Sequence, residues 1–502
     1  MIEKESISNN KPVLFGTDGI RGTVGTYPLI AEFVVNLGTA AGIVMGKSSS
    51  RPLAIVGRDT RQSGQMLQHA ITTGLLTTGV TVVDVGVIPT PGVAFLVHKI
   101  QAQAGIIISA SHNPVDQNGI KIVNSQGSKL TASVEYEIEQ LATNPTSLPK
   151  KTPERFGRSV NGEMLKELYI DSLLDEHPDL NLDSLKIIVD CSNGAASSIA
   201  PECLGRLGAK IIAIHASPTG ININQDSGSE HARKHPIVMH KLIQEYSADF
   251  GIAFDGDADR VVFVDDAGNL IDGDHILGIL AEYFDRHQEL LGRTIVSTKM
   301  RNQGLVNYLQ SNKIRFIETK VGDKYVTEKL VNLSYNHGSS GKFGVGGEQA
   351  GHVILYDKDH VTGDGIRTAL FVIRAFLEAD IKSFSEMAWR IKKTPQVIAS
   401  AKVASKPDLD RIEELSLLQT QLEREGLGIT RMELRYSGTE PLFRVMIESD
   451  HSTDEQLLAD IAWRLCRVVQ EASGMDTAGH DQIEILNVTR GGIIKPNSLS
   501  II

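Results

Sequence analysis

Short apolar runs that alternate with polar, glycine-containing turns are the main pattern of this chain. Three times an apolar run ends in such a turn, a helical pattern follows, and a second apolar run closes the unit, over residues 53–87, 185–214 and 294–321. A β-α-β crossover of this kind places its two strands in parallel and covers them with a helix. The pattern therefore predicts three related α/β domains with mixed, largely parallel sheets.

Changes in composition indicate where these units end. Residues 143–159 are rich in Pro, Thr, Lys and Arg, a helical pattern starts near His275, and the crossover pattern is lost near residues 392–396. We expect four domains, over residues 1–160, 161–272, 273–395 and 396–502, the last of them a smaller α+β domain.

Composition and charge exclude several classes of protein. The chain has 502 residues, too many for one core, and its net charge of −11 argues against a general nucleic-acid binder. It has a polar N-terminus and no run of 18 apolar residues, so we expect neither a signal peptide nor a membrane span. Three widely spaced cysteines indicate free thiols. We expect a cytoplasmic monomer or homodimer.

Ser111 is the candidate for the residue that reacts. It lies in Ser109-Ala110-Ser111-His112-Asn113-Pro114, directly after an apolar run, residues 104–108, that predicts a buried strand. Ligands of open α/β sheets bind at the carboxyl ends of the strands. A serine hydrolase using Ser111 and His112 is disfavoured, because sequence neighbours seldom form a nucleophile–base pair and no Gly-x-Ser-x-Gly surrounds the serine.

Three carboxylates alternate in the segment Asp255-Gly256-Asp257-Ala258-Asp259-Arg260. In an extended segment this spacing points them to one side, where they would repel unless a hard cation such as Mg²⁺ lay between them. An EF-hand is disfavoured, because Arg260 stands where its loop needs glycine and Asp266 where it needs glutamate. A solvated acidic turn is the plain alternative. A phosphatase with Asp255 as nucleophile would leave the Ser111 segment unexplained.

A candidate phosphate-binding loop is Arg435-Tyr436-Ser437-Gly438-Thr439-Glu440-Pro441, followed by Arg444. Hydroxyls and backbone N–H groups of Ser437, Gly438 and Thr439 suit an anion, and two guanidinium groups add planar pairs of donors. The alternative is an ordinary turn between two strands, over residues 432–434 and 443–447.

The segment Gly346-Gly347-Glu348-Gln349-Ala350-Gly351-His352 offers small residues for close approach and polar groups for sugar hydroxyls. His352 is either a proton-transfer residue or an ordinary loop histidine.

Two basic residues outside these segments, Arg21 and Lys121, are either site residues or ordinary surface side chains. Arg21 lies between glycines in residues 15–22 and suits a phosphate. Lys121 lies ten residues after Ser111 and could return to the same site, where it is a candidate for proton transfer, as His352 is. Each could instead be a solvated side chain. The segment 57–64 is interpreted as the structural start of a helix capped by Ser63.

Together and in this order, these segments resemble the α-D-phosphohexomutase superfamily, from Phe15 to Arg444. The resemblance implies a heart-shaped enzyme with three α/β domains and a smaller C-terminal domain. It places a phosphoserine on Ser111, and Mg²⁺ on Asp255, Asp257, Asp259 and a Ser111 phosphoryl oxygen. The other implied residues are catalytic Arg21, His112, Lys121 and His352, substrate-binding Arg260, Gly322, Glu348, Gln349 and Ala350, and phosphate-binding Arg435, Ser437, Gly438, Thr439 and Arg444.

Within the superfamily, four segments are similar to the bacterial members that act on glucosamine phosphates. These are Gly347-Glu348-Gln349 in place of a Gly-Glu-Met loop, residues 321–326, 362–365 and 440–446. The resemblance implies interconversion of glucosamine 6-phosphate and glucosamine 1-phosphate, with a hexose or hexosamine 1,6-bisphosphate as activator. The alternatives are mutases of mannose or glucose phosphates and a non-catalytic phosphosugar-binding protein.

The chain departs from the superfamily at three places. Ala350 stands where serine is common, and extra residues occur around 332–343 and after Gly474. We expect residues 332–343 to form an irregular loop, rich in Gly, Ser and Asn, and residues 487–502 an irregular tail.

Overall fold

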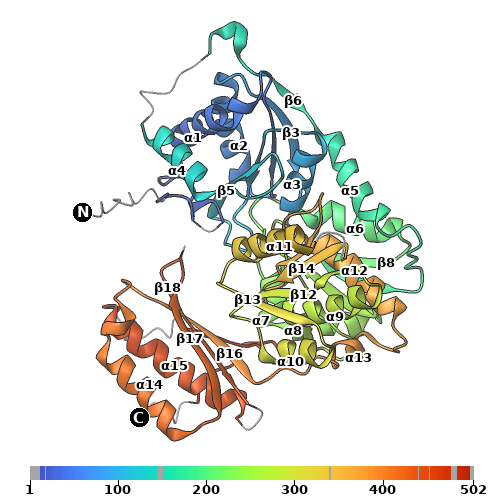
Figure 1. Cartoon of the computed structure of the whole chain (residues 1–502), viewed down its shortest axis with the longest axis vertical. Helices are drawn as coiled ribbons and strands as arrows, with labels where there is room; N and C mark the ends of the chain where they lie inside the picture. Colours follow the sequence, from blue (N-terminus) through green and yellow to red (C-terminus); the bar gives the residue numbers. More distant parts are fainter. Residues whose placement is uncertain are drawn as a thin grey trace.

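Four β-sheets follow one another along the chain, each with its own helices (Figure 1). The computed structural model describes residues 12–16, 18–144, 151–337, 341–438, 440–450, 453–475 and 483–497. Three sheets are mixed and the C-terminal sheet is antiparallel, which confirms the predicted fold class. Within these residues no helix is both long and apolar enough to cross a bilayer.

The first sheet has the order β1-β5-β4-β2-β3-β6. Its elements are β1 (Ile20–Thr23), α1 (Ala31–Met45), β2 (Leu53–Arg58), α2 (Ser63–Thr77), β3 (Thr81–Val87), α3 (Thr90–Lys99), β4 (Ala104–Ile108), β5 (Gln117–Asn124), α4 (Ala132–Thr143) and β6 (Ser159–Asn161). β4 is fully buried and matches the predicted strand residue for residue. The predicted helix cap is wrong: Gln62 occupies the cap position of α2, and the Ser63 hydroxyl instead accepts a hydrogen bond from Asn118 (2.9 Å).

The second sheet has the order β11-β10-β9-β7-β8. Its elements are α5 (Lys166–Asp175), β7 (Lys186–Asp190), α6 (Ala196–Arg206), β8 (Lys210–Ile214), α7 (Gly228–Lys234), α8 (Pro236–Tyr246), β9 (Phe250–Phe254), β10 (Val261–Val264) and β11 (Leu270–Ile271). The acidic segment predicted to be extended is a turn between the antiparallel strands β9 and β10, with Ala258 in the left-handed region (φ 55°). The turn, rather than strand alternation, gathers the carboxylates.

The third sheet has the order β13-β12-β14-β15. Its elements are α9 (Gly273–Arg286), β12 (Leu290–Thr298), α10 (Gln303–Ser311), β13 (Arg315–Thr319), α11 (Asp323–His337), β14 (Phe343–Gly347), β15 (Val353–Tyr356), α12 (Gly365–Glu378) and α13 (Phe384–Ala388). The loop predicted over residues 332–343 is wrong in its first half, because α11 continues to His337. Residues 338–340 lie outside the described part.

The C-terminal sheet has the order β17-β18-β16-β19. Its elements are β16 (Gln396–Lys402), α14 (Glu413–Glu425), β17 (Ile429–Tyr436), β18 (Leu442–Ser449), α15 (Glu455–Ala472) and β19 (Ile483–Asn487). The pairs β16–β18, β17–β18 and β16–β19 are antiparallel, so the crossover pattern does end where the sequence predicts.

Buried apolar contacts join the second and third sheets into one core, whereas the C-terminal sheet has a core of its own. Cys191, Cys203 and Cys466 are buried free thiols, as expected.

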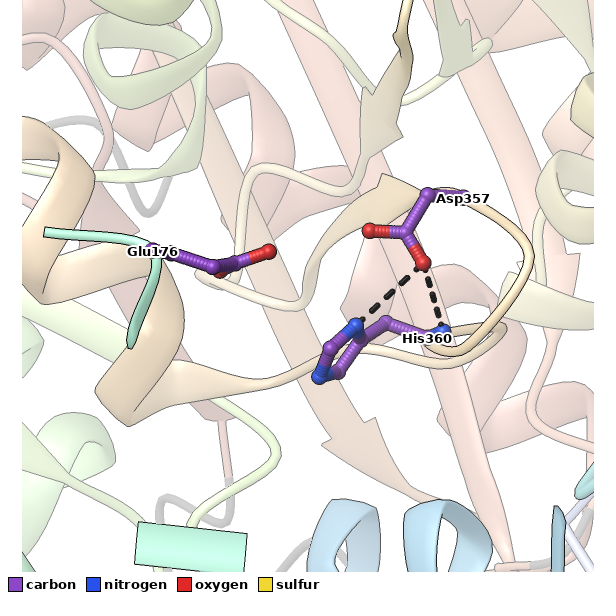
Figure 2. A group of neighbouring side chains, drawn as sticks. All are labelled: Glu176, Asp357 and His360. Carbon is purple, nitrogen blue, oxygen red and sulfur yellow. Dashed lines mark hydrogen bonds and ion pairs between the residues drawn. The ribbon is translucent and has the colours of Figure 1, made fainter. Parts of the chain in front are cut away.

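A buried guanidinium strengthens the contact between the second and third sheets. Glu176, Asp357 and His360 come close enough together to resemble a metal site (Figure 2). However, Arg367, almost completely buried, pairs with both Glu176 and Asp357 at 2.5 Å. The cation that these carboxylates hold is therefore a side chain of the protein.

Candidate active site

Ser111 begins the tight loop that follows β4. Its backbone is in the left-handed region (φ 54°) and its side chain is almost completely buried. The Ser111 N–H donates to Ser109 Oγ (2.9 Å), and the Ser109 hydroxyl donates to Asp59 (2.6 Å). These bonds hold the serine in a conformation that non-glycine residues seldom adopt.

Arg61 holds the rest of the Ser111 loop. Its guanidinium is fully buried, pairs with Asp59 (2.9 Å), and donates to the carbonyls of Ser111 (3.0 Å) and Asn113 (2.7 Å). Asn224, from the second domain, donates to the Ser111 carbonyl as well (2.8 Å). Segment 57–64 is structural, as interpreted, but its structural task is to shape this loop.

The acidic turn meets Ser111 directly. The Ser111 hydroxyl donates to Asp255 Oδ2 (2.5 Å), and carboxylate oxygens of Asp255, Asp257 and Asp259 lie within 4.8 Å of one another. Burial and the two neighbouring aspartates raise the pKa of Asp255 well above its usual value. Burial also favours a raised pKa of Asp257, but Lys121 and Thr90 outweigh it and lower that pKa.

The three aspartates have the donor set of a divalent cation site. Asp257 Oδ1 and Asp259 Oδ1 are buried and accept no hydrogen bond from any described residue. Arg260 Nε lies 3.8 Å from Asp259 Oδ1, beyond hydrogen-bond distance, and buried carboxylate oxygens that accept no hydrogen bond are costly unless a cation neutralises them. Oxygen ligands of this kind fit Mg²⁺.

Lys121 lies on the other side of this triad. Its Nζ is 2.9 Å from Asp257 and 3.0 Å from Asp18. Burial favours a lower pKa of Lys121, but Asp18 and Asp257 outweigh it and raise that pKa. Asp18 also pairs with Arg21, and the Thr90 hydroxyl donates to Asp257 (2.6 Å). Thr90 stands in no recognisable motif, so the sequence offers no signal for it.

Two histidines lie beside the residues of this site, His112 at the Ser111 hydroxyl and His352 at Asp259. His112 Nδ1 is 3.4 Å from the Ser111 hydroxyl, and burial and Arg260 lower the pKa of His112 well below its usual value. His352 Nε2 lies 3.7 Å from Asp259 and 3.8 Å from Asp323, while its Nδ1 is buried without a hydrogen-bond partner in the described chain.

Residues 348–352 form the loop between β14 and β15, which we call the sugar loop. Its Glu348 carboxylate accepts a hydrogen bond from the Gly322 N–H (3.1 Å). The Gln349 side chain is directed inward and donates to Asp274 (2.9 Å) and Gln396 (2.8 Å).

The arginines of the C-terminal domain stand side by side. Arg435 on β17 pairs in register with Arg444 on β18, and neither Nε has a hydrogen-bond partner in the described residues. Burial and the charge of Arg444 lower the pKa of Arg435. Two such cations are suited to bind an anion. Thr439 lies outside the described residues.

One cavity of about 340 Å³ brings most of the predicted site residues together. It is lined by Arg21, His112, Asp259, Arg260, Gly322, Glu348, Gln349, Ala350, His352, Arg435, Ser437, Gly438 and Arg444, and in addition by Glu230, Lys234, Ser400 and Glu484, which the sequence does not single out. Four predicted residues are not among the lining residues: Ser111, Lys121, Asp255 and Asp257. All four are buried, and they form two hydrogen-bonded pairs, Ser111 with Asp255 and Lys121 with Asp257.

The sequence matches models of four successive domains of one family. The descriptions are phosphoglucomutase/phosphomannomutase alpha/beta/alpha domain I for residues 12–148, domain II for 167–268, domain III for 272–394, and the C-terminal domain for 397–464.

Two curated relatives are named phosphoglucosamine mutase. The protein of Citrifermentans bemidjiense is 40% identical over 89% of this chain and 96% of its own length. That of Methylobacillus flagellatus is 42% identical over 91% of this chain and 98% of its own.

Solved structures share the fold. A phosphoglucomutase/phosphomannomutase family protein from Burkholderia thailandensis matches with a TM-score of 0.70 and 22% identity, over 91% of this chain and 97% of its own. Aspergillus fumigatus N-acetylphosphoglucosamine mutase, solved with GlcNAc-6P and magnesium, matches with a TM-score of 0.61 and 16% identity, over 93% of this chain and 97% of its own. On the four domain matches and these relatives, the chain belongs to the phosphoglucomutase/phosphomannomutase family, the α-D-phosphohexomutases.

Proposed function

We propose that this protein is an isomerase that interconverts glucosamine 6-phosphate and glucosamine 1-phosphate, through a phosphoserine at Ser111 and a bound hexosamine 1,6-bisphosphate. The observation that carries the proposal is one cavity that reaches from His112, whose Nδ1 is 3.4 Å from the Ser111 hydroxyl, to Arg435 and Arg444. The relatives named phosphoglucosamine mutase support the choice of sugar.

We infer that the first domain ends after β6, at Asn161 rather than at the expected residue 160, because β6 pairs with β3 of the first sheet. The other divisions lie at residues 272 and 395, and each domain supplies one part of the site. The first supplies the Ser111 loop, the second the acidic triad, the third the sugar loop and the fourth the arginine pair. A site assembled from four domains suits a substrate with two chemically different ends.

The first half of the reaction moves the phosphoryl group from Ser111 to the free hydroxyl of a sugar monophosphate. The bond between phosphorus and Ser111 Oγ breaks, and a bond from phosphorus to the sugar oxygen forms. Arg21 and Lys121 offset negative charge on the transferring group, because phosphoryl transfer depends mainly on positioning and electrostatics. A Mg²⁺ ion held by Asp255, Asp257 and Asp259 would supply further charge neutralisation at that group.

The acceptor hydroxyl loses its proton during this transfer. Lys121 is held in its charged form by the carboxylates around it, which suits it to neutralise charge rather than to accept the proton. We assign acceptance of this proton to His352, which lines the cavity and has a ring nitrogen without a hydrogen-bond partner in the described structure. The Ser111 oxygen that leaves phosphorus takes up one proton and becomes a hydroxyl again, so that the transfer is balanced.

The second half of the reaction returns the other phosphate of the bisphosphate to Ser111. Arg435 and Arg444 hold whichever phosphate is not reacting, together with Ser437 and Gly438, which line the same cavity. The sugar loop contacts the hydroxyls. Because this grip does not depend on the anomeric carbon, the bisphosphate can bind in either orientation.

The proposed function is tested by comparing kcat/KM for glucosamine, glucose and mannose 6-phosphates in coupled assays with Mg²⁺ and a bisphosphate primer. The proposal expects glucosamine 6-phosphate to be preferred. Preference for glucose or mannose phosphate would identify a phosphoglucomutase or phosphomannomutase instead. No turnover, together with no phosphoryl adduct on the intact protein, would indicate a phosphosugar-binding protein.

A further inference from the structure

Gln349 is the residue of the sugar loop whose side chain bonds to the C-terminal domain. The side chain is 3% exposed, and its Nε2 donates to Asp274 Oδ2 in the third domain and to Gln396 Oε1 at the start of β16. Asp274 and Gln396 are themselves completely buried. The amide thus bridges two domains inside the protein.

The bonds around this amide fix its orientation. Asp274 Oδ2 also accepts from the Asn302 N–H (3.0 Å), and Gln396 uses its own Nε2 to reach the carbonyl of Arg301 (3.4 Å), so that Asp274 Oδ2 and Gln396 Oε1 both act as acceptors. Gln349 must therefore present its NH₂ group to both. A thioether such as methionine could supply neither bond.

The backbone of the sugar loop is held separately, on the third domain. The Gly273 N–H donates to the Gln349 carbonyl (3.0 Å), and a Cβ at Gly273 would lie 2.0 Å from the Glu348 carbonyl. The loop therefore packs tightly on the beginning of α9. Its direct bond to the fourth domain is the one made by the Gln349 side chain.

Gln396 connects the Gln349 side chain to the strands that carry the arginine pair. It begins β16, whose Ile398 and Ser400 line the cavity, and β16 pairs with β18, which carries Arg444. Asn302 also donates to Gln396 Oε1 (3.2 Å) and to the Thr394 carbonyl (3.0 Å), in the segment that enters the C-terminal domain. Other bonds also join the third and fourth domains, among them those of Arg431 to the Arg301 carbonyl and of the Gln303 N–H to Glu448. The Gln349 amide is the side chain of the sugar loop that takes part in this contact.

We propose that Gln349 is a positioning residue that sets the distance between the sugar loop and the C-terminal arginine pair. This inference rests on the proposed function. It predicts that replacing Gln349 lowers the mutase rate, because the substrate is held at both ends. The hydrolysis rate of the phosphorylated Ser111 should not change, because neither the sugar nor the distal phosphate takes part in that reaction.

The test compares Gln349→Met with Gln470→Met in the full chain. Gln470 is an equally buried amide in the C-terminal domain (2% exposed) that donates to the Lys402 carbonyl, far in sequence from the sugar loop. Gln349→Met should lower kcat/KM for glucosamine 6-phosphate by about tenfold or more, mainly through KM. It removes the bond from the sugar loop to β16, although Asn302 still donates to both Gln396 and Asp274. Hydrolysis of the phosphorylated enzyme, followed by intact mass, should be unchanged. Gln470→Met should leave both rates unchanged.

A second pair of measurements examines the contact itself. Gln396→Met should resemble Gln349→Met, and the double variant should lose no more than about the larger single loss, because both remove one shared bond. Three results would each overturn the proposal. The first is a loss of kcat/KM in the double variant that equals the product of the two single losses. The others are an unchanged kcat/KM in Gln349→Met, and hydrolysis and mutase rates that fall equally in that variant.

Hydrogen exchange separates failure of this inference from failure of the proposed function. Gln349→Met should speed exchange at residues 346–352 and 396–400, and Gln470→Met should not. This result is expected whichever sugar the wild-type protein turns over. Unchanged exchange at both segments would overturn the inference even if the wild-type protein is an active mutase.

Discussion

Arg435 and Arg444 stand directly opposite each other on β17 and β18, although like charges in that position destabilise a sheet. Their Nε atoms have no hydrogen-bond partner in the described structure, and Arg435 lines the cavity with Arg444. Glu440 pairs with Arg444 (2.6 Å), whereas Arg435 has no ion pair among the described residues. A bound anion would neutralise Arg435, and the non-reacting phosphate of the sugar is that anion in our account.

Replacing one of these arginines should weaken substrate binding without weakening the fold. We expect Arg435→Gln to raise the KM for glucosamine 6-phosphate at least about tenfold, since a charge-assisted hydrogen bond contributes roughly 1.5–3 kcal/mol. Unfolding by denaturant should show equal or higher stability. Arg424→Gln, on the exposed face of α14, serves as the control and should leave KM unchanged. An unchanged KM in Arg435→Gln would contradict the assignment of the phosphate loop.

Removal of divalent cations should stop turnover, because Asp257 and Asp259 each keep a buried oxygen without a hydrogen-bond partner in the described residues. Chelation should abolish mutase activity, and added Mg²⁺ should restore it. Asp259→Asn should require a higher Mg²⁺ concentration for half-maximal activity, whereas exposed Glu423→Gln should not. Full activity of the chelated wild-type protein would refute the metal assignment.

Gly363 provides the space that His352 occupies. A Cβ at Gly363 would lie 2.5 Å from His352 Nε2, a contact too short for either group to keep its place. Gly363→Ala should therefore displace the imidazole and lower kcat by about tenfold or more, within the range for loss of a positioned acid–base group.

The matched control for this glycine is Gly205→Ala in α6. A Cβ there meets its nearest atom at 3.8 Å, so the change should leave kcat unaltered and can slightly stabilise the helix. Equal kcat in Gly363→Ala and the wild-type protein would show that the position of His352 does not matter for turnover.

Much of the fold could be predicted because local patterns decide it. β4 is five apolar residues between turns, and each of the three crossovers has parallel strands. The acidic turn shows where prediction from local patterns fails. Its carboxylates do converge, as predicted, but they do so through Ala258 in a left-handed conformation. Alanine in a sequence gives no indication of that conformation. Ser63 fails as a cap because its hydroxyl serves Asn118 on β5, a contact made only in the folded chain.

The residues of the candidate site also fall into those that the sequence predicts and those that it does not. Segments such as 109–114 and 435–441 could be recognised because several suitable residues occur together. The roles of Arg61, Thr90 and Asn224 at the site could not be predicted, because the site atoms that these residues contact lie 50 or more positions away in the sequence. Gln349 was recognisable as a member of the sugar loop, whereas the inward direction of its side chain depends on Asp274 and Gln396.

Stability should fall in mild acid because of His177. This residue packs on Phe371 between the second and third domains, and neither ring nitrogen has a hydrogen-bond partner in the described chain. Burial lowers the pKa of His177 to about 4 from 6.5. The folded state therefore binds the proton less readily than the unfolded state. The stabilisation is complete above pH 6.5 and is lost as the pH falls through 4.

The measurement is denaturant unfolding at pH 7 and pH 5 for the wild-type protein and His177→Leu. His177 should account for about 1–2 kcal/mol of the wild-type loss between these values, and the variant should lack that part. Equal losses in the two proteins would show that His177 does not titrate as its burial implies.

The central claim is that Ser111 stores the phosphoryl group between the two halves of the reaction. Transfer of a radioactive phosphate tests it most directly: the protein is mixed with Mg²⁺ and labelled glucosamine 1,6-bisphosphate, and the labelled peptide is identified. We predict that label appears on Ser111, that unlabelled glucosamine 6-phosphate removes it into the sugar at a rate compatible with kcat, and that Ser111→Ala takes up none. Mutase turnover without labelled protein, or equal labelling of Ser111→Ala, would contradict the account.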